Sequence, residues 1–528
     1  MVFNDDEKPA APIAGSKDGL VTMAIPDYSP AEVGMTNASL TAMVVITGAS
    51  SSAIREGLDL VAVLDVSGSM AGAKFESMKK AMQFVIMKLT DLDRLSIVTF
   101  SSTATRLNVL GRMTTAAKSA LNSKVDALVA NGGTNIKAGL EMGLAILRDR
   151  VNTGSRTPNI LLMSDGRPEP KEADGRDVNP GEVPVYTVGF GSGTEYKLMS
   201  DLATKSLGGT YSAVPDGNNL IGSFSMVLGA LVTVVATDVQ LTLKRKTPDR
   251  DLDKMTVAPG TTYPTTTDEN GTITIRFGTL SSTESRKVNI NFTLKDRTET
   301  GRFNATLAVA RHSYAAQETA QSPQNIVIPR SLNPSSTADD PSSAGAAAQR
   351  RVQAEVVRRQ HAETITDASV LAEAGKLDDA RDKIMDAQND VEDIMLDDGD
   401  KMVTALRGEL LQLQTFMESQ ALYDKRGHPY ALATITSHGR QRIAGRGDEG
   451  ELASLYITPR MITYLEQAKR FEENPKEPVP TADDDVKEEI KTDPLGTIAA
   501  PLALYLDTAI QALQSIQKVL ADAAQPKR

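Results

Sequence analysis

The sequence predicts a doubly wound α/β fold built on a mainly parallel sheet. Apolar runs of strand length alternate with segments of helical periodicity over residues 58–236. This alternation is typical of a parallel sheet that helices cover on both faces. The run LDLVAVLDV at 58–66 is almost continuously apolar, as expected for a strand buried on both faces. Ligands of such sheets bind beyond the carboxyl ends of the strands, so functional residues are expected there.

Each element of this region follows from its own pattern. Short apolar runs rich in β-branched residues predict strands at 58–66, 94–100, 158–166 and 183–191. Apolar residues at helical spacing predict helices at 74–89, 114–130, 136–151, 196–208 and 217–230. Methionines of the 74–89 helix are interpreted as core residues, because flexible thioethers fill irregular gaps.

The flanking segments contain β patterns without helices. Residues 17–57 hold two strand-like runs, and residues 237–330 hold several more, separated by turns. The second set predicts a small antiparallel β domain. Because these segments bracket the α/β region, we expect 17–57 to pair with 237–330 across it. Residues 1–16 are predicted to be disordered.

The C-terminal third is predicted to be helical and then irregular. The composition of 331–349 indicates a linker, and 350–422 predicts a helical hairpin or a three-helix unit. Residues 423–500 are predicted to be mostly loop, including a basic strip at 436–448 that is interpreted as a solvated loop. Residues 501–522 predict an amphipathic helix, expected to dock onto the protein's own helices.

Composition excludes several classes of function. The 528 residues carry a formal net charge of −11, which argues against a general nucleic-acid binder. The chain contains no cysteine, which excludes disulfides, thiolate metal sites and a zinc-bound RING within it. The start lacks the pattern of a signal peptide, and we expect a cytoplasmic protein. The apolar stretch 220–241 approaches the length of a membrane span, but its polar residues favour a buried helix followed by a buried strand.

Oxygen-bearing side chains follow the ends of the predicted strands. Asp65, Ser67 and Ser69 have the spacing D-x-S-x-S after the first buried strand, Thr134 lies in a Gly-rich loop, and Asp165 ends another strand. Each residue alone is also compatible with a helix cap or a turn. Together they form an all-oxygen set of two carboxylates and three hydroxyls, which suits a hard divalent cation, Mg²⁺, Mn²⁺ or Ca²⁺.

The motifs DVSGSM, GGTN and MSDG, in this order, resemble the von Willebrand factor type A domain and its metal-ion-dependent adhesion site. The resemblance covers about 58–236. It implies a Rossmann-like sheet with a Mg²⁺-type ion held by Asp65, Ser67, Ser69, Thr134 and Asp165. It also implies that an Asp or Glu of a protein partner completes the coordination of the ion.

A second resemblance concerns the overall layout. The β segments around the α/β region, the helical hairpin, and then HPYALATITSHGRQRIAGRGD and YITPRM are similar to plant A-domain proteins with a wavy-growth type C-terminal region. Many of that group carry a RING finger and act as ubiquitin ligases. Because this chain has no cysteine, the resemblance implies a binding module without ligase activity, whose partners include RING-bearing homologues.

Two further hypotheses stay open beside a non-enzymatic interaction module. One is a metal-dependent hydrolase or phosphatase-like enzyme, although aspartyl phosphatases need D-x-D and residue 67 is Ser. The other is a regulator of ubiquitin ligation that binds RING-bearing relatives through 341–528. The histidines are scattered along the sequence and lack zinc-hydrolase spacing: His312, His361, His428 and His438.

Overall fold

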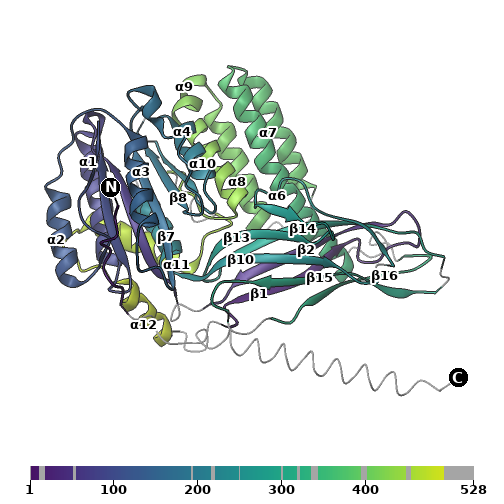
Figure 1. Cartoon of the computed structure of the whole chain (residues 1–528). Helices are drawn as coiled ribbons and strands as arrows, with labels where there is room; N and C mark the ends of the chain where they lie inside the picture. Colours follow the sequence, from purple (N-terminus) through teal and green to yellow (C-terminus); the bar gives the residue numbers. More distant parts are fainter. Residues whose placement is uncertain are drawn as a thin grey trace.

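The computed structural model describes residues 2–10, 18–50, 55–191, 194–215, 220–248, 250–298, 301–317, 321–334, 343–393, 401–447 and 454–492. Three parts lie side by side: an α/β domain, an antiparallel β sandwich and a helical region that contacts both (Figure 1). The predicted fold class is confirmed. The helix predicted at 501–522 lies outside the described residues.

The central sheet of the α/β domain has the strand order β5-β4-β3-β7-β8-β9, with β6 also paired to β4. The pairs β3–β4, β3–β7, β7–β8 and β8–β9 are parallel. Its strands are β3 (Gly57–Asp65), β4 (Arg94–Phe100), β5 (Ala104–Arg106), β6 (Gly111–Arg112), β7 (Arg156–Ser164), β8 (Val185–Phe190) and β9 (Tyr211–Val214). Its helices are α1 (Ala73–Lys88), α2 (Thr115–Asp126), α3 (Ile136–Arg148), α4 (Tyr196–Thr204) and α5 (Leu220–Leu231).

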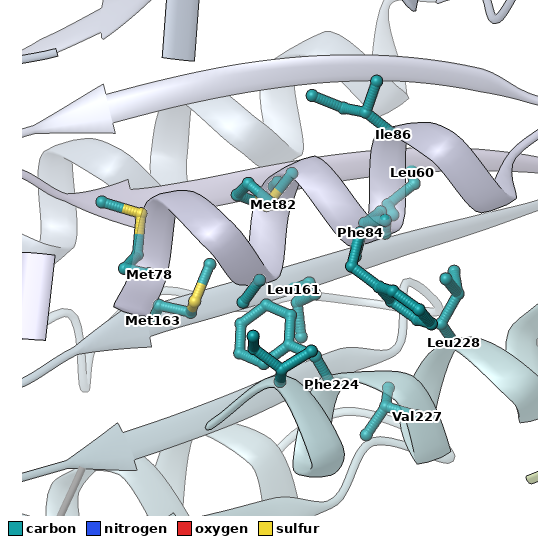
Figure 2. Packing of buried hydrophobic residues seen from close by; sticks show 14 of the residues in the cluster. Leu60, Met78, Met82, Phe84, Ile86, Leu161, Met163, Phe224, Val227 and Leu228 are labelled. Atoms are coloured by element: carbon teal, nitrogen blue, oxygen red, sulfur yellow. The ribbon is translucent and has the colours of Figure 1, made fainter. Parts of the chain in front are cut away.

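The core of this domain explains the methionine-rich helix. Met78 and Met82 of α1 are fully buried and lie beside Met163 of β7 and Phe224 of α5 (Figure 2). All residues of α5 are buried, which accounts for the apolar stretch that begins at 220. Among the residues that the structure describes, none of the helices combines the length and the apolarity that crossing a bilayer requires.

The sandwich is assembled from segments on both sides of the α/β domain. Strand β2 (Ser39–Gly48) pairs antiparallel with β14 (Ser285–Leu294), about 240 residues later in the chain. The two sheets have the orders β1-β2-β14-β11 and β12-β13-β10-β15-β16 and enclose one apolar core. The other strands are β1 (Val21–Ser29), β10 (Val234–Arg245), β11 (Leu252–Val257), β12 (Thr265–Thr267), β13 (Ile273–Ser281), β15 (Phe303–Ser313) and β16 (Gln324–Arg330).

The helical region begins before the predicted linker ends. Helix α6 (Ala344–Glu373) starts six residues inside 331–349, where the Ser343 hydroxyl accepts a hydrogen bond from the Ala346 amide at 3.1 Å. Alanines at 346–348 favour this early start. Helices α7 (Leu377–Glu392) and α8 (Lys401–Phe416) pack with α6 around one core.

The prediction that 423–500 is mostly loop is wrong. This segment contains α10 (His428–Arg440), α11 (Pro459–Glu473) and α12 (Ala482–Thr492), after the short α9 (Gln420–Leu422). Helix α11 packs on α5 of the α/β domain. Its Tyr464 and Phe471 belong to that domain's core, so tertiary burial stabilises this helix, whose sequence is rich in charged residues.

The described part of the basic strip, residues 436–447, is also not a solvated loop. Arg442 is 2% exposed, and its guanidinium donates to Glu284 of the sandwich at 2.9 Å and to the Tyr186 hydroxyl of β8 at 2.8 Å. The Ala213 amide of β9 donates to the Gly445 carbonyl at 2.8 Å. A buried guanidinium needs an acceptor for each of its donors, and Arg442 finds acceptors on both the α/β domain and the sandwich. The strip therefore joins these two parts.

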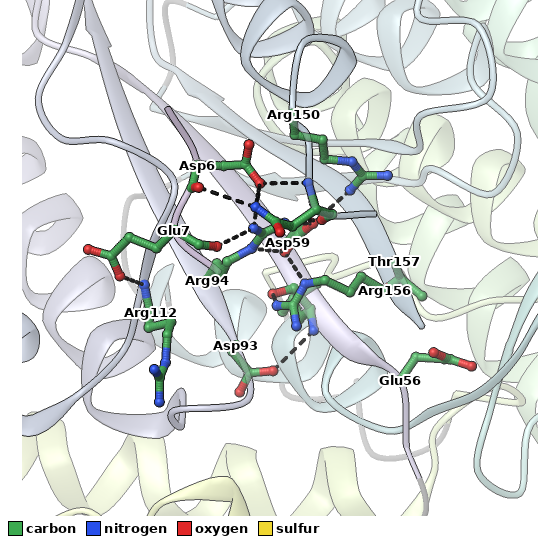
Figure 3. Close-up of polar contacts among 12 residues, drawn as sticks. Asp6, Glu7, Glu56, Asp59, Asp93, Arg94, Arg112, Arg150, Arg156 and Thr157 are labelled. Atoms are coloured by element: carbon green, nitrogen blue, oxygen red, sulfur yellow. Dashed lines mark hydrogen bonds and ion pairs between the residues drawn. The ribbon is translucent and has the colours of Figure 1, made fainter. Parts of the chain in front are cut away.

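The prediction of a disordered N-terminus fails for residues 2–10. Asp5 pairs with Arg106, and Asp6 pairs with Arg94 at 2.7 Å. The Glu7 carboxylate accepts a hydrogen bond from the Arg112 amide at 2.7 Å. Figure 3 shows Asp6 and Glu7 lying against the amino-terminal edge of the sheet. The acidic segment is held by arginines of β4 and its neighbours, a complementarity that the segment's own composition does not reveal.

Candidate metal centre

Strand β3 delivers Asp65 to the carboxyl edge of the sheet. The Asp65 side chain is fully buried. It accepts hydrogen bonds from the Ser67 amide at 2.8 Å and from the Ser164 hydroxyl at 2.6 Å. Burial raises the pKa of Asp65 to about 6, although these hydrogen bonds act in the opposite direction. A nearby cation would favour the ionised carboxylate.

Ser67, Ser69 and Asp165 form a connected chain of oxygen atoms. The two serine hydroxyls lie 3.0 Å apart, and the Ser69 hydroxyl donates to Asp165 Oδ1 at 2.8 Å. Ser67 and Asp165 are buried, whereas Ser69 is exposed. Asp165 directly follows β7, the neighbour of β3 in the sheet. The cluster is therefore closed on the side of the sheet and open on the side of Ser69.

Backbone contacts bring the loop of Thr134 to the same edge. The Gly68 amide donates to the Gly132 carbonyl at 3.0 Å, and the Asn131 amide donates to the Val66 carbonyl at 2.7 Å. Gly166 lies between two hydroxyls: a Cβ atom there would be 3.1 Å from Thr134 Oγ1 and 3.2 Å from Ser69 Oγ. A glycine at this position leaves the space between these oxygens free of side-chain atoms.

The structure thus gathers all five sequence-predicted residues at one edge, together with two residues that the sequence analysis missed. The Ser164 hydroxyl donates a hydrogen bond to Asp65, and Ser164 is the serine of the MSDG motif. The Lys74 ammonium pairs with Asp165 Oδ2 and lies 3.4 Å from the Ser69 carbonyl oxygen. Its place in the first turn of α1, five residues after Ser69, is a spacing signal that could have indicated this pairing.

The donor chemistry fits a hard divalent cation. The set offers two carboxylates and three hydroxyls, all oxygen atoms, which Mg²⁺ and Ca²⁺ prefer. Asp165 pairs with Lys74, whereas the described contacts of Asp65 are a hydroxyl and a backbone amide, so the edge retains negative charge. Asp65, Ser67, Ser69, Thr134 and Asp165 would hold the ion.

Comparison with known proteins agrees with this geometry. Residues 59–225 match the von Willebrand factor type A domain family. The chain carries a von Willebrand factor type A domain. Such domains are protein-interaction modules, and their metal-ion-dependent adhesion site takes a divalent metal. A second match, over residues 400–470, is to the family described as VWA / Hh protein intein-like, and it covers α8, α10 and most of α11.

Curated relatives share mainly the A domain. The chain is 35% identical over 176 residues to "E3 ubiquitin-protein ligase WAV3" of Arabidopsis thaliana, covering 30% of this chain and 23% of that protein. It is 29% identical over 188 residues to "Inter-alpha-trypsin inhibitor heavy chain H3" of Homo sapiens, covering 33% and 21%. The chain spans less than a quarter of the length of these relatives.

Two solved structures share the wider fold. The von Willebrand factor type A protein from Catenulispora acidiphila has a TM-score of 0.57 at 20% identity, over 73% of this chain and 89% of that chain. The ArnB paralog VWA2 from Sulfolobus acidocaldarius has a TM-score of 0.51 at 13% identity, over 79% and 97%. The coverage shows that the arrangement of the A domain with its flanking regions recurs at low sequence identity.

Proposed function

We propose that this protein is a metal-dependent protein-interaction module. A divalent cation, Mg²⁺, Mn²⁺ or Ca²⁺, binds Asp65, Ser67, Ser69, Thr134 and Asp165, and an Asp or Glu of a partner completes its coordination. The observation that carries the proposal is the convergence of five oxygen-bearing side chains at an edge that is open beside Ser69.

The coordination chemistry explains why the partner contributes a carboxylate. Hydroxyl ligands are neutral, so an ion bound largely by Ser67, Ser69 and Thr134 keeps most of its charge. Mg²⁺ demands six oxygen ligands in near-octahedral geometry. A carboxylate from outside supplies both the missing ligand and the compensating charge, and removing the metal therefore removes the binding surface.

The hydrolase alternative gains no specific support. Aspartyl phosphatases need a second carboxylate two residues after the nucleophile, whereas Ser67 occupies that position and contacts the Ser69 hydroxyl. Asp65 accepts from Ser164 and from the Ser67 amide, and both contacts hold its carboxylate within the buried edge. The edge is better suited to hold an ion than to attack a substrate.

Affinity capture from cell extract tests the proposal, with Mg²⁺ and with EDTA. The parent is compared with Asp65→Ala/Ser67→Ala and with a control, Ser119→Ala/Glu141→Ala, which alters two exposed residues of the same domain. We expect one set of partners to disappear with EDTA and with the site variant, and to persist with the control. A partner list that ignores both EDTA and the site variant would exclude an adhesive role for the metal.

A narrower part of the proposal concerns ubiquitin ligation. The plant relative named above is called an E3 ubiquitin-protein ligase, and this chain has no cysteine with which to build a RING. It would act by binding RING-bearing relatives through 341–528. Capture of purified RING-bearing relatives by the full chain tests this role, and failure to bind any of them contradicts it without affecting the metal site.

A further inference from the structure

Two histidines and a glutamate meet inside the helical region, away from the A-domain edge. His361 of α6, Glu409 of α8 and His438 of α10 are 2%, 3% and 2% exposed. Both Nε2 atoms lie beside the same carboxylate oxygen, Glu409 Oε2, at 2.8 Å and 2.7 Å. We propose that this cluster is a second metal site, which holds a late first-row divalent ion such as Zn²⁺ between the three helices.

The ligand types select the ion. Imidazole nitrogens with one carboxylate suit Zn²⁺ and its neighbours in the transition series, whereas Mg²⁺ and Ca²⁺ prefer oxygen ligands alone. A tetrahedral ion about 2.0–2.1 Å from each donor needs donors about 3.3 Å apart. The three donors lie within 4.8 Å of one another, and small side-chain rotations would bring them to that spacing.

The three side chains are buried together, which affects how they titrate. Burial lowers the pKa of His438 to about 4. Burial acts to raise the pKa of Glu409, but the Arg446 guanidinium and the hydrogen bonds from His361 and His438 outweigh it and hold that pKa well below its usual range. Metal binding requires neutral imidazole and ionised carboxylate, so each ring would carry its proton on Nδ1 when its Nε2 atom, now beside Glu409 Oε2, faces the ion.

The outer nitrogens of the two rings have different surroundings. His438 Nδ1 lies 3.0 Å from the Tyr456 hydroxyl. His361 Nδ1 is buried and has no hydrogen-bond partner among the described residues.

His361 also lines a small pocket with Gln360 and Asp390. The volume of this pocket is about 10 Å³, which is close to the smallest space that holds one water. Metal-bound histidines usually donate this second N–H to an outer partner, and a water there would satisfy His361.

Charges around the cluster decide what completes the coordination. Arg446 pairs with Glu409 Oε1 at 2.7 Å, which leaves Oε2 for the ion. Glu355 compensates Arg358, which lies near His438. The ion therefore adds two positive charges to a balanced group, and this excess favours an anion, hydroxide or chloride, as the fourth ligand. The bound ion would fasten α6, α8 and α10 together.

Cobalt binding tests the proposal, in full-length protein that also carries Asp65→Ala/Ser67→Ala so that the A-domain edge cannot take the ion. We expect one equivalent of Co²⁺ to give the intense visible bands of tetrahedral coordination, and Zn²⁺ to displace it. His361→Gln should abolish the bands. Tyr456→Phe, which keeps all three ligands but removes the hydroxyl that contacts His438 Nδ1 and Arg358, should weaken Co²⁺ binding about 10- to 100-fold. His428→Gln changes a histidine of α10 outside the cluster and should leave the bands unchanged.

A second measurement needs no variant of the cluster: crystals of the parent protein are soaked in Zn²⁺. An anomalous-scattering peak between the three side chains supports the proposal. Absence of that peak, or parent protein that shows no tetrahedral Co²⁺ bands, overturns it and leaves the cluster as a metal-free hydrogen-bond network. Neither outcome bears on the Mg²⁺ site, because the background used in the cobalt titration lacks two of its five ligands, Asp65 and Ser67.

Discussion

Strand β3 carries a buried aspartate near each end, and the two environments differ in charge. Asp59, at the amino edge, is surrounded by arginines: Arg94 donates to it at 2.6 Å and 2.8 Å, Arg156 at 2.6 Å and Arg150 at 2.8 Å (Figure 3). Asp65, at the carboxyl edge, accepts only from Ser67 and Ser164 among the described residues. Both side chains are fully buried.

The two ends of the sheet differ in whether the chain itself compensates the charge of its buried aspartate. At the amino edge, three guanidinium groups compensate the Asp59 charge, and Asp6 of the N-terminal segment adds a second carboxylate. That group is complete within the chain. Around Asp65, hydroxyl and amide dipoles take the place of cations, so no cation among its described contacts compensates the charge of this carboxylate. A metal ion would complete this second group.

The largest expected effect comes from removing the aspartate of the complete group. Asp59→Asn removes the carboxylate that Arg94, Arg150 and Arg156 share, although Arg94 keeps its pair with Asp6. This change should lower the free energy of unfolding by about 3–5 kcal/mol. Asp65→Asn, on the same strand and equally buried, should change it by less than about 1 kcal/mol without divalent metal. Chemical denaturation in EDTA measures both, and equal losses would show that the two edges do not differ in this way.

Magnesium should act on one edge alone. At a concentration one hundred times the dissociation constant, Mg²⁺ is expected to raise the free energy of unfolding of the parent by about 2.7 kcal/mol. Asp65→Asn should abolish this gain. Asp59→Asn should retain it, because that side chain lies at the opposite end of β3. Thermal unfolding with and without Mg²⁺ measures the gain, and an undiminished response in Asp65→Asn would place the ion elsewhere.

The same strand shows what could be predicted from sequence. The alternation of apolar strands and helices predicts the α/β fold, because burial on both faces leaves a continuous apolar run. The edge residues could be proposed because parallel strands end together, which requires no knowledge of long-range contacts. The arginines around Asp59 could not be found in this way, since Arg94, Arg150 and Arg156 are distant in sequence and only the folded sheet aligns them.

The C-terminal region was predicted less well for a related physical reason. Helices α11 and α12 are rich in charge, and α11 owes its order to apolar side chains such as Tyr464 that enter the core of another domain. Likewise, His361, Glu409 and His438 come from three helices, so no local spacing connects them. Local sequence patterns predict helices and strands that pack against elements nearby in the sequence. They do not predict contacts between domains.

The N-terminal segment offers a pH-dependent test of the complete edge. Burial acts to raise the pKa of Asp6, but the amides of Val151 and Asn152 and the Arg94 guanidinium lower it from 3.8 to about 2. A depressed folded-state pKa contributes stability above pH 4 that is lost as the pH falls toward 2. Asp6→Asn should therefore cost about 2 kcal/mol at pH 7, and clearly less at pH 2.5. Denaturation at both pH values checks this, and a cost independent of pH would contradict it.

The smallest effect concerns Lys74, the cation that does reach the carboxyl edge. Its side chain is 36% exposed and pairs with Asp165, so the pair is worth up to about 1 kcal/mol. Because the ammonium and a metal ion compete for the same carboxylate, Lys74→Gln should tighten Mg²⁺ binding by roughly fivefold, as measured by calorimetric titration. Lys80→Gln removes the same charge from an exposed position of α1 and should leave the affinity unchanged. Weaker Mg²⁺ binding by Lys74→Gln would instead show that this lysine supports the ion-bound state. The carboxyl edge would then resemble the amino edge in using its own cation as a structural element.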